Sequence, residues 1–288
     1  MLRLKQLTRW FLALAAVAAF QPAALAQQRV VSVDGTISEI VHALGAADRL
    51  VGVDTTSVFP AAMHALPKVG YKRALSAEGL LSLQPDLVLY NQDAGPPVVL
   101  QQLQQAGLQL VKIPNKHSVD GTIEKVRAVA KTLDLASEGE ALVERIRQEI
   151  ADATPVGDTP PRVVFVLHIG AGSDLAAGGD TSADGIISLA GGVNALGDAF
   201  TGYKPITAEA MVGAAPDVIL VTERNLAQLG GVDSLLQRAG MAATPAGTAR
   251  RVVPIDGLMM LGFGPRLPQA MQILSEQFAL AEASASAE

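Results

Sequence analysis

Tyr71 is the side chain best suited to bind a metal-containing ligand. It lies in the stretch VGYKRALSAEG, directly after Gly70 and before the cations Lys72 and Arg73. A free phenol ionises at a pH of about 10, and neighbouring positive charge favours the phenolate form. Phenolate is a hard anionic ligand that suits ferric iron, including haem iron. The segment therefore predicts that Tyr71 can bind ferric iron directly.

A second segment, LMMLGFGPRLP at residues 258–268, combines one cation with apolar side chains. Arg266 can pair with carboxylates. Its apolar neighbours can lie against a flat ring, and these are Met259, Met260, Leu261 and Phe263. Apolar walls, arginines for carboxylates and one phenolate are the requirements of a haem pocket. We therefore expect both segments to contribute to one pocket.

Of the histidines, His168 has the most informative position. It ends the apolar run RVVFVLH, just before the glycine-rich IGAGS. Strand ends that face a crevice are common ligand sites in α/β folds, so His168 either faces the cleft or serves the fold. His42 fits a helix surface, and solvation accounts for His64 and His117 as well as a function does.

The sequence lacks the common signatures of an enzyme. GAGSDL begins like a dinucleotide fingerprint, but Leu175 occupies its third glycine position. There is no G-x-S-x-G motif, and the absence of cysteine excludes a thiol nucleophile. The four histidines form no close ligand pair. These observations predict a binding protein rather than an enzyme.

The first residues predict export. Basic residues at positions 3–9, an apolar run at 10–20 and the A-x-A signal at 24–26 are typical of a secretory signal peptide at 1–26. With no cysteine for disulfides or lipid attachment, we expect a soluble periplasmic protein that begins at Gln27. Loss of three basic residues would leave 19 basic and 28 acidic residues, a net charge of −9, which argues against nucleic acid as a partner.

The chain contains an internal repeat. LSAEGLLSLQPDLVLY at 75–90 aligns without gaps with ITAEAMVGAAPDVILV at 206–221, an offset of 131 residues. Each copy is typical of a capped helix followed by a buried strand. A weaker pair joins VDGTISEIVHALGAAD at 33–48 to ADGIISLAGGVNALGD at 183–198. Such repeats indicate two copies of one structural unit.

Short apolar strands alternate with helical stretches, which predicts α/β lobes whose mainly parallel sheets are covered by helices. We expect an N-terminal lobe at 27–136 and a C-terminal lobe at 157–288. Between them, Ser137 begins an S-x-x-E capping box and an amphipathic pattern follows, which predicts a linking helix at 137–156. A helical link holds two lobes across a cleft with limited hinge motion, and such clefts favour ligands.

Across its mature length the chain resembles the periplasmic haem-binding proteins of bacterial haem ABC importers, in the helix-linked class of substrate-binding proteins. The most specific motifs are GYKRALSAEGLLSLQPDLVL, AAGGDTSADGIISLAGG, LGGVDSLL with TPAG, and LMMLGFGPRLP. The resemblance implies that Tyr71 is the axial iron ligand with Arg266 near it, and that His168 is a second ligand in some members. Lys72 and Arg73 complete the expected haem site.

The resemblance also implies a partner. Glu78 and Glu209 are equivalent in the two repeats, and such paired acidic residues meet arginines on the two permease subunits of these importers. An alternative, compatible role is to offset the helix dipole, which contributes about 0.3–1 kcal/mol.

We therefore expect a monomeric periplasmic carrier of ferric haem b that delivers haem to an inner-membrane ABC permease and its ATPase. A cobalamin or ferric-siderophore carrier of the same architecture is the alternative. A periplasmic enzyme with a two-lobed body is less favoured.

Overall fold

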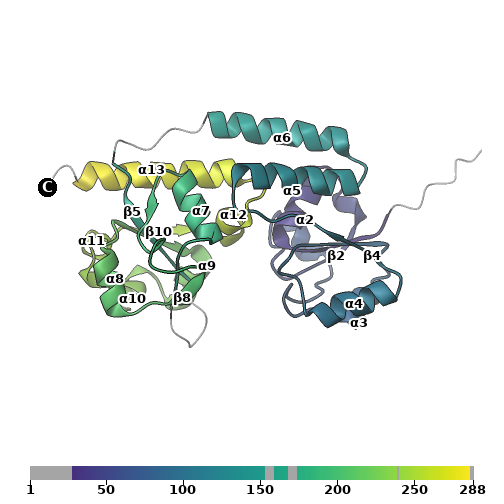
Figure 1. Ribbon diagram of the computed structural model, residues 1–288, viewed down its shortest axis with the longest axis horizontal. Coiled ribbons are helices and arrows are strands. Elements are labelled where there is room, and N and C mark those ends of the chain that lie inside the picture. The colour runs from purple at the N-terminus through teal and green to yellow at the C-terminus, as the bar shows by residue number, and fades with distance from the viewer. Residues whose placement is uncertain (1–27, 153–158, 168–173, 239, 286–288) are drawn as a thin grey trace, which may run out of the picture.

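The computed structural model describes residues 28–152, 159–167, 174–238 and 240–285, which form two α/β lobes (Figure 1). The expected signal peptide at 1–26 lies outside these residues. Among the described helices, none is both long and apolar enough to cross a membrane.

The N-terminal lobe contains a four-stranded parallel sheet in the order β2-β1-β3-β4. Its strands are β1 (Val30–Val33), β2 (Leu50–Val53), β3 (Leu87–Tyr90) and β4 (Gln109–Lys112). Its helices are α2 (Gly35–Ala43), α3 (Ala77–Leu81) and α4 (Pro97–Gln105), with short 3-10 helices at Ala47–Arg49 and Ala61–Ala65. Valine and leucine fill β1 and β3, since both faces of the sheet are covered.

The C-terminal lobe is built on a mixed sheet in the order β10-β9-β5-β6-β8, with β7 beside β5. The described strands are β5 (Arg162–Leu167), β6 (Leu175–Ala177), β7 (Val193–Asn194), β8 (Tyr203–Pro205), β9 (Val218–Thr222) and β10 (Val252–Ile255). The pairs β5–β6 and β6–β8 are antiparallel, and the other pairs are parallel. The sheet is therefore mainly parallel in its centre.

Helices cover both faces of this sheet. They are α7 (Ser182–Leu189), α8 (Ala208–Ala214), α9 (Glu223–Leu229), α10 (Val232–Leu236), α11 (Pro245–Thr248), α12 (Gly257–Gly262) and α13 (Leu267–Ala285), with a 3-10 helix at Met241–Ala243. One core cluster unites α7, α12 and α13 against the sheet, and another lies beneath α8, α10 and α11.

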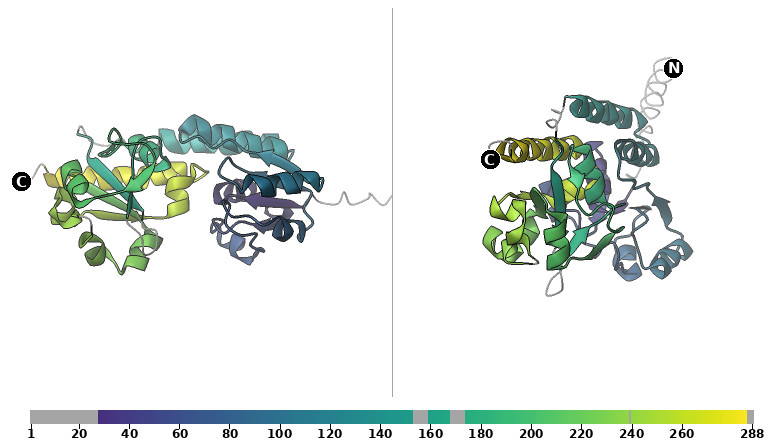
Figure 2. Two further views of the ribbon diagram at one scale, coloured as in Figure 1. Left: turned by 60° about the horizontal axis from the view of Figure 1, so that its bottom comes forward. Right: turned by 60° about the vertical axis from the view of Figure 1, so that its left-hand side comes forward.

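Two helices, α5 (Val119–Thr132) and α6 (Ala136–Ala151), lead from one lobe to the other. Figures 1 and 2 show α6 above the gap between the lobes, with α13 at the same side of the molecule. The expected capping box at Ser137 is wrong, because α6 begins at Ala136 and Leu135 is its N-cap without a side-chain hydrogen bond. The Leu135 carbonyl accepts the Gly139 N–H, so Ser137 lies inside the helix.

The longer repeat corresponds to one structural unit in each lobe. Ser76 caps α3 and Thr207 caps α8 in the same way. After the helices, Gln84 and Ala215 both adopt left-handed backbone conformations, with φ of 47° and 43°. The aspartates of the two Pro-Asp pairs then accept backbone N–H groups at the starts of β1 and β5, from Arg29 and Arg162, each at 2.8 Å. The two lobes therefore place α3 and α8 equivalently.

Candidate functional site

Tyr71 lies in a loop that is fixed on both sides while its own side chain is exposed. Val69 is buried and its N–H donates to the Val53 carbonyl of β2 at 3.0 Å, while the Val53 N–H donates to the Pro67 carbonyl at the same distance. Leu75 is also buried, and its N–H donates to the Gly95 carbonyl at 2.9 Å. Tyr71 between them is 44 % exposed, which is unusual for a large ring in this chain. The loop therefore presents a phenol from a well-anchored backbone.

Lys72 anchors this loop instead of pointing freely at a ligand. Its Nζ lies 2.6 Å from the carboxylate of Asp34, the N-cap of α2. The Asn91 amide donates to the same oxygen of Asp34 at 2.9 Å. Burial alone would raise the pKa of Asp34, but the Lys72 and Lys125 charges hold it below its ordinary value. This ion pair already uses the ammonium of Lys72. The expected contact between Lys72 and haem stays a prediction.

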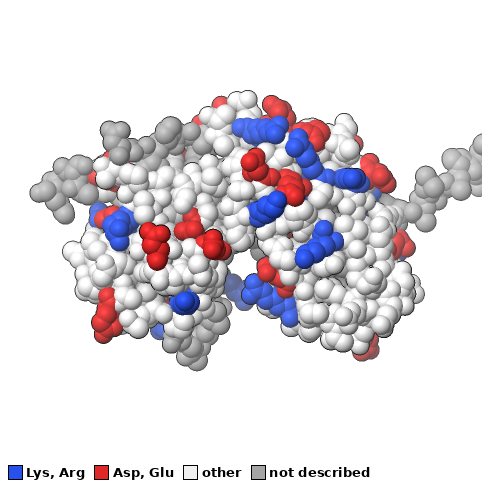
Figure 3. Space-filling view, viewed as in Figure 1, with Lys and Arg blue, Asp and Glu red and all other residues white. Residues whose placement is uncertain are grey.

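Arg73 is the more available cation of the pair. Its side chain is 61 % exposed and lies 3.6 Å from the Asp93 carboxylate. It is also within electrostatic range of Tyr203 in the opposite lobe: burial raises the pKa of Tyr203, and the positive charge of Arg73 opposes that shift. Figure 3 shows a hollow between the lobes, with Lys and Arg side chains along its N-lobe edge. Arg73 is therefore an exposed cation of the N-terminal lobe that remains accessible to a ligand.

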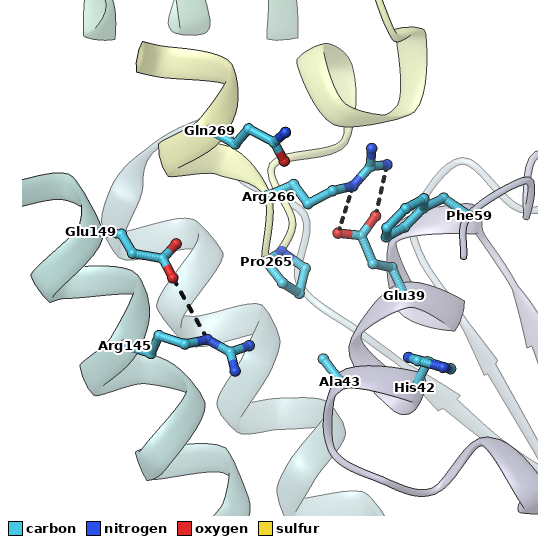
Figure 4. A pocket seen from close by; sticks show the side chains of 9 residues that line it. All are labelled: Glu39, His42, Ala43, Phe59, Arg145, Glu149, Pro265, Arg266 and Gln269. Atoms are coloured by element: carbon cyan, nitrogen blue, oxygen red, sulfur yellow. Dashed lines mark hydrogen bonds and ion pairs between the residues drawn. The ribbon is translucent and has the colours of Figure 1, made fainter. Parts of the chain in front are cut away.

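Arg266 makes a different set of contacts from those we expected. Its Nε and Nη2 each donate to the Glu39 carboxylate of α2 at 3.1 Å, and its Nη1 lies 3.2 Å from Asp256 (Figure 4). Its guanidinium also stacks 3.8 Å from the centre of the Phe59 ring. Arg266, Glu39 and Phe59 border a pocket of about 370 Å³ beside α6. The predicted place of Arg266 near Tyr71 stays untested, but its hydrogen bonds bridge the two lobes.

The apolar residues beside Arg266 are mostly core residues. Met259, Met260 and Phe263 are at most 7 % exposed and pack in the cluster formed by α7, α12 and α13. Our expectation that they could lie against a flat ligand is wrong for these three. These side chains of α12 and the residue after it pack against the C-lobe sheet. Leu261 is only partly buried.

The carboxyl end of α12 is held by the N-terminal lobe. Lys125 of α5 donates to the carbonyls of Gly262 and Phe263 at 2.7 and 3.1 Å, although its side chain is almost fully buried. Thr122 donates to the Phe263 carbonyl, and Thr36 to the Gly262 carbonyl, both at 3.2 Å. Burial lowers the pKa of Lys125 to about 8. These bonds satisfy helix-end carbonyls that would otherwise lack partners.

His168, the expected second ligand, lies outside the described residues. A different histidine, His117, occupies the junction between the lobes. Its ring centre is 5.4 Å from that of Phe263, and Lys72 and Asp93 both influence its pKa. Burial, followed by the charge of Lys125, lowers that pKa, which favours the neutral ring. No sequence motif predicts this position, because only the docking of α12 brings Phe263 to it.

Glu78 and Glu209 are exposed in the first turns of α3 and α8. In Figure 1 both helices lie on the side of the molecule away from α6 and α13. The pKa of Glu209 is lowered, mainly by backbone hydrogen bonding at the helix start. Each lobe therefore presents one carboxylate on a common side.

Comparisons with known proteins agree with this architecture. A family model described as periplasmic binding protein matches residues 30–257. The structure is similar to the periplasmic heme-binding protein RhuT from Roseiflexus sp. RS-1, with 41% identity, a TM-score of 0.85, and coverage of 88% of this chain and 99% of that one. It is also similar to BhuT in complex with two hemes, with 45% identity, a TM-score of 0.82, and coverage of 88% and 98%.

Among proteins compared by sequence, a vitamin B12-binding protein from Yersinia pestis is 25% identical over 260 residues, which are 89% of this chain and 88% of that protein. The predicted fold class and the resemblance to haem-binding members are both confirmed by the match and the two structures. The chain belongs to the periplasmic binding protein family, whose members bind substrates for transport.

Proposed function

We propose that this protein carries ferric haem in the cleft between its lobes and delivers it to an inner-membrane ABC permease and its ATPase. The observation that supports this most is Tyr71, a 44 % exposed phenol on an anchored loop, in a chain 41–45% identical to two heme-binding proteins of known structure. Haem is the cargo in this proposal, and the protein does no chemistry on it.

Each cleft residue has a distinct role in the proposal. The Tyr71 oxygen binds the ferric iron as phenolate, which suits a hard cation. Arg73 offers an exposed cation that can pair with a haem carboxylate. The Asp34–Lys72 ion pair holds the loop in place beneath them. His168 is kept as a possible second ligand, and Arg266 as a residue near the ligand.

The similarity to vitamin B12-binding proteins supports one rival, a cobalamin carrier. Corrinoid cobalt has four ring ligands and one from its own tail, so a cobalamin carrier needs no phenolate on the metal. Titration of purified protein with hemin and, separately, with cyanocobalamin tests the choice. We expect a Soret shift with hemin at stoichiometric amounts and no binding of cyanocobalamin. Binding of cyanocobalamin alone would overturn the haem proposal.

We further propose that the mature chain begins at Gln27 and acts as a soluble monomer in the periplasm, with lobes at 27–136 and 157–288 around the link at 137–156. The signal-like start and the lack of cysteine support this. Intact-mass measurement of exported protein should give the mass of residues 27–288. A product that retains Met1 would contradict the proposed export.

The proposal assigns Glu78 and Glu209 to permease docking. They are exposed, occupy equivalent positions in the two repeats and lie on one side of the molecule (Figure 1). The double variant Glu78→Ala/Glu209→Ala should bind haem normally but fail to stimulate the ATPase of the permease complex. Normal stimulation would leave both glutamates only the role of offsetting the helix dipole.

A further inference from the structure

Two exposed aliphatic residues, Leu81 and Val212, occupy equivalent positions in the two lobes. They are 131 residues apart, which is the offset of the repeat. Leu81 is 37 % exposed and Val212 is 44 % exposed, whereas the apolar residues before them, Leu80 and Met211, are fully buried. A single exposed aliphatic residue needs no explanation, but the same exposure at both copies of a repeat does.

Each aliphatic residue also has a carboxylate one helical turn before it. Glu78 precedes Leu81 by three positions in α3, and Glu209 precedes Val212 by three positions in α8. Residues with this spacing are neighbours on one helix face, with Cβ atoms roughly 5–6 Å apart. Each lobe therefore presents one carboxylate–aliphatic pair, and the two pairs are Glu78/Leu81 and Glu209/Val212.

The backbone beneath the two pairs is the same. Both helices begin at a hydroxyl N-cap and end before a left-handed residue, Gln84 or Ala215. The Pro-Asp pair that follows each helix is fixed to the sheet by a backbone N–H to aspartate bond of 2.8 Å. Figure 1 shows α3 and α8 on the same side of the molecule, opposite α6 and α13. The two carboxylate–aliphatic pairs therefore have the same kinds of side chain and the same backbone structure beneath them.

We infer that the two carboxylate–aliphatic pairs form one docking surface for a two-fold symmetric membrane partner. Each half of that partner presents a cation for the carboxylate and, beside it, an apolar recess for Leu81 or Val212. The inference rests on the proposed delivery to a permease and adds the aliphatic half of the contact. A partner with two copies of one site satisfies both pairs, whereas a partner with a single site satisfies one.

A second copy of this chain fits the surface less well. Docking of one such face on another would bring carboxylates together, and like charges at an interface oppose association. The chain as a whole carries an excess of acidic residues, 28 against 22 basic ones, which adds to this repulsion. Charge complementarity therefore favours a cationic partner over self-association.

The test measures binding of the haem-loaded protein to its permease–ATPase complex in nanodiscs. We compare the wild type with Leu81→Ser, Val212→Ser and the double variant. Leu280→Ser is the matched control, because Leu280 is 62 % exposed on α13, away from α3 and α8. We expect about threefold weaker binding for each single variant, about tenfold for the double variant, and no change for Leu280→Ser. Hemin spectra and unfolding midpoints should stay unchanged in all of them.

Two results would overturn the inference. One is unchanged permease binding by the double variant while Glu78→Ala/Glu209→Ala loses binding, which would leave the delivery function standing. The other is a wild-type dimer in sedimentation equilibrium that Leu81→Ser/Val212→Ser dissociates. If neither the wild type nor any variant binds the complex, the proposed delivery function fails as well, and hemin titration then shows whether haem binding stands alone.

Discussion

Polar side chains are paired differently at the junction between the lobes and in the loop that carries Tyr71. At the junction, Arg266 makes two hydrogen bonds to buried Glu39, and Lys125 donates to two carbonyls of the opposite lobe. At the cleft, Tyr71 is 44 % exposed and Arg73 is paired only at 3.6 Å. At the junction, the polar side chains hydrogen-bond within the protein, whereas in the cleft Tyr71 and Arg73 remain available to a ligand.

This difference has a mechanical consequence. A buried charge is stable only where its partners stay in place, so the Arg266–Glu39 pair resists separation of α2 from the end of α12. The helical link above them adds stiffness. We therefore expect the lobes to move little when a ligand enters, and the cleft side chains to do most of the adjusting.

The largest effect should come from breaking the junction. Arg266→Ala leaves the Glu39 carboxylate buried without its cation and should lower the free energy of unfolding by about 3 kcal/mol. Urea denaturation measures this. The double variant Glu39→Leu/Arg266→Met is the control, because an apolar pair should recover most of the loss. An unchanged stability with a loss of haem affinity would leave Arg266 only its proposed role near the ligand.

Tyr71→Phe tests the cleft side of the comparison. The ring and the anchored backbone remain, so stability should not change, but the oxygen that binds iron is lost. Even partners of metal ligands alter affinity about 10- to 100-fold when mutated, so we expect haem affinity to fall by about a hundredfold or more. Hemin titration monitored by the Soret band measures it. Tyr90→Phe, in β3, is a matched control, and equal loss in both variants would remove the special role of Tyr71.

The pH dependence of stability should report on Lys125. Its pKa is lowered from 10.5 to about 8 in the folded protein, mainly by burial. Between pH values of about 8 and 10.5, the unfolded chain keeps a proton on Lys125 that the folded chain has released. The contribution of Lys125 to the free energy of unfolding therefore rises with pH. Relative to Lys125→Met, the wild type should gain about 2 kcal/mol between about pH 7 and about pH 10. A difference between the wild type and Lys125→Met that does not change with pH would contradict the prediction.

The sequence was a good guide to the fold because the fold depends on local patterns and on the repeat. Valine-rich strands, capped helices and the offset of 131 residues predicted two α/β lobes with a helical link. The same patterns could not predict the junction. Arg266 and Glu39 are 227 positions apart, and no local signal joins them. One clue existed in the sequence, since Glu39 is the one carboxylate in the otherwise largely apolar stretch GTISEIVHA that forms α2.

The candidate site was only partly accessible from sequence for a related reason. Residue type identified Tyr71 as a possible ligand, and its exposed position agrees with that role. Residue type could not separate Lys72 from Arg73, which are adjacent and equally charged. Their difference comes from Asp34, which the end of β1 places 2.6 Å from Lys72. Tertiary structure therefore decides which of two neighbouring cations remains available.

The smallest predicted effect follows from that difference. Arg73→Gln removes an exposed cation beside the phenol, so haem affinity should fall about fivefold, with a smaller fall at high salt because exposed charges are screened. Its free energy of unfolding should match the wild type, since the Asp93 contact is long and partly solvated. Lys72→Gln is the matched comparison, because it leaves buried Asp34 without its nearest cation. Its main effect should be a lower free energy of unfolding. If Arg73→Gln destabilises the fold while Lys72→Gln weakens only haem binding, the two cations have the reverse of the roles assigned to them.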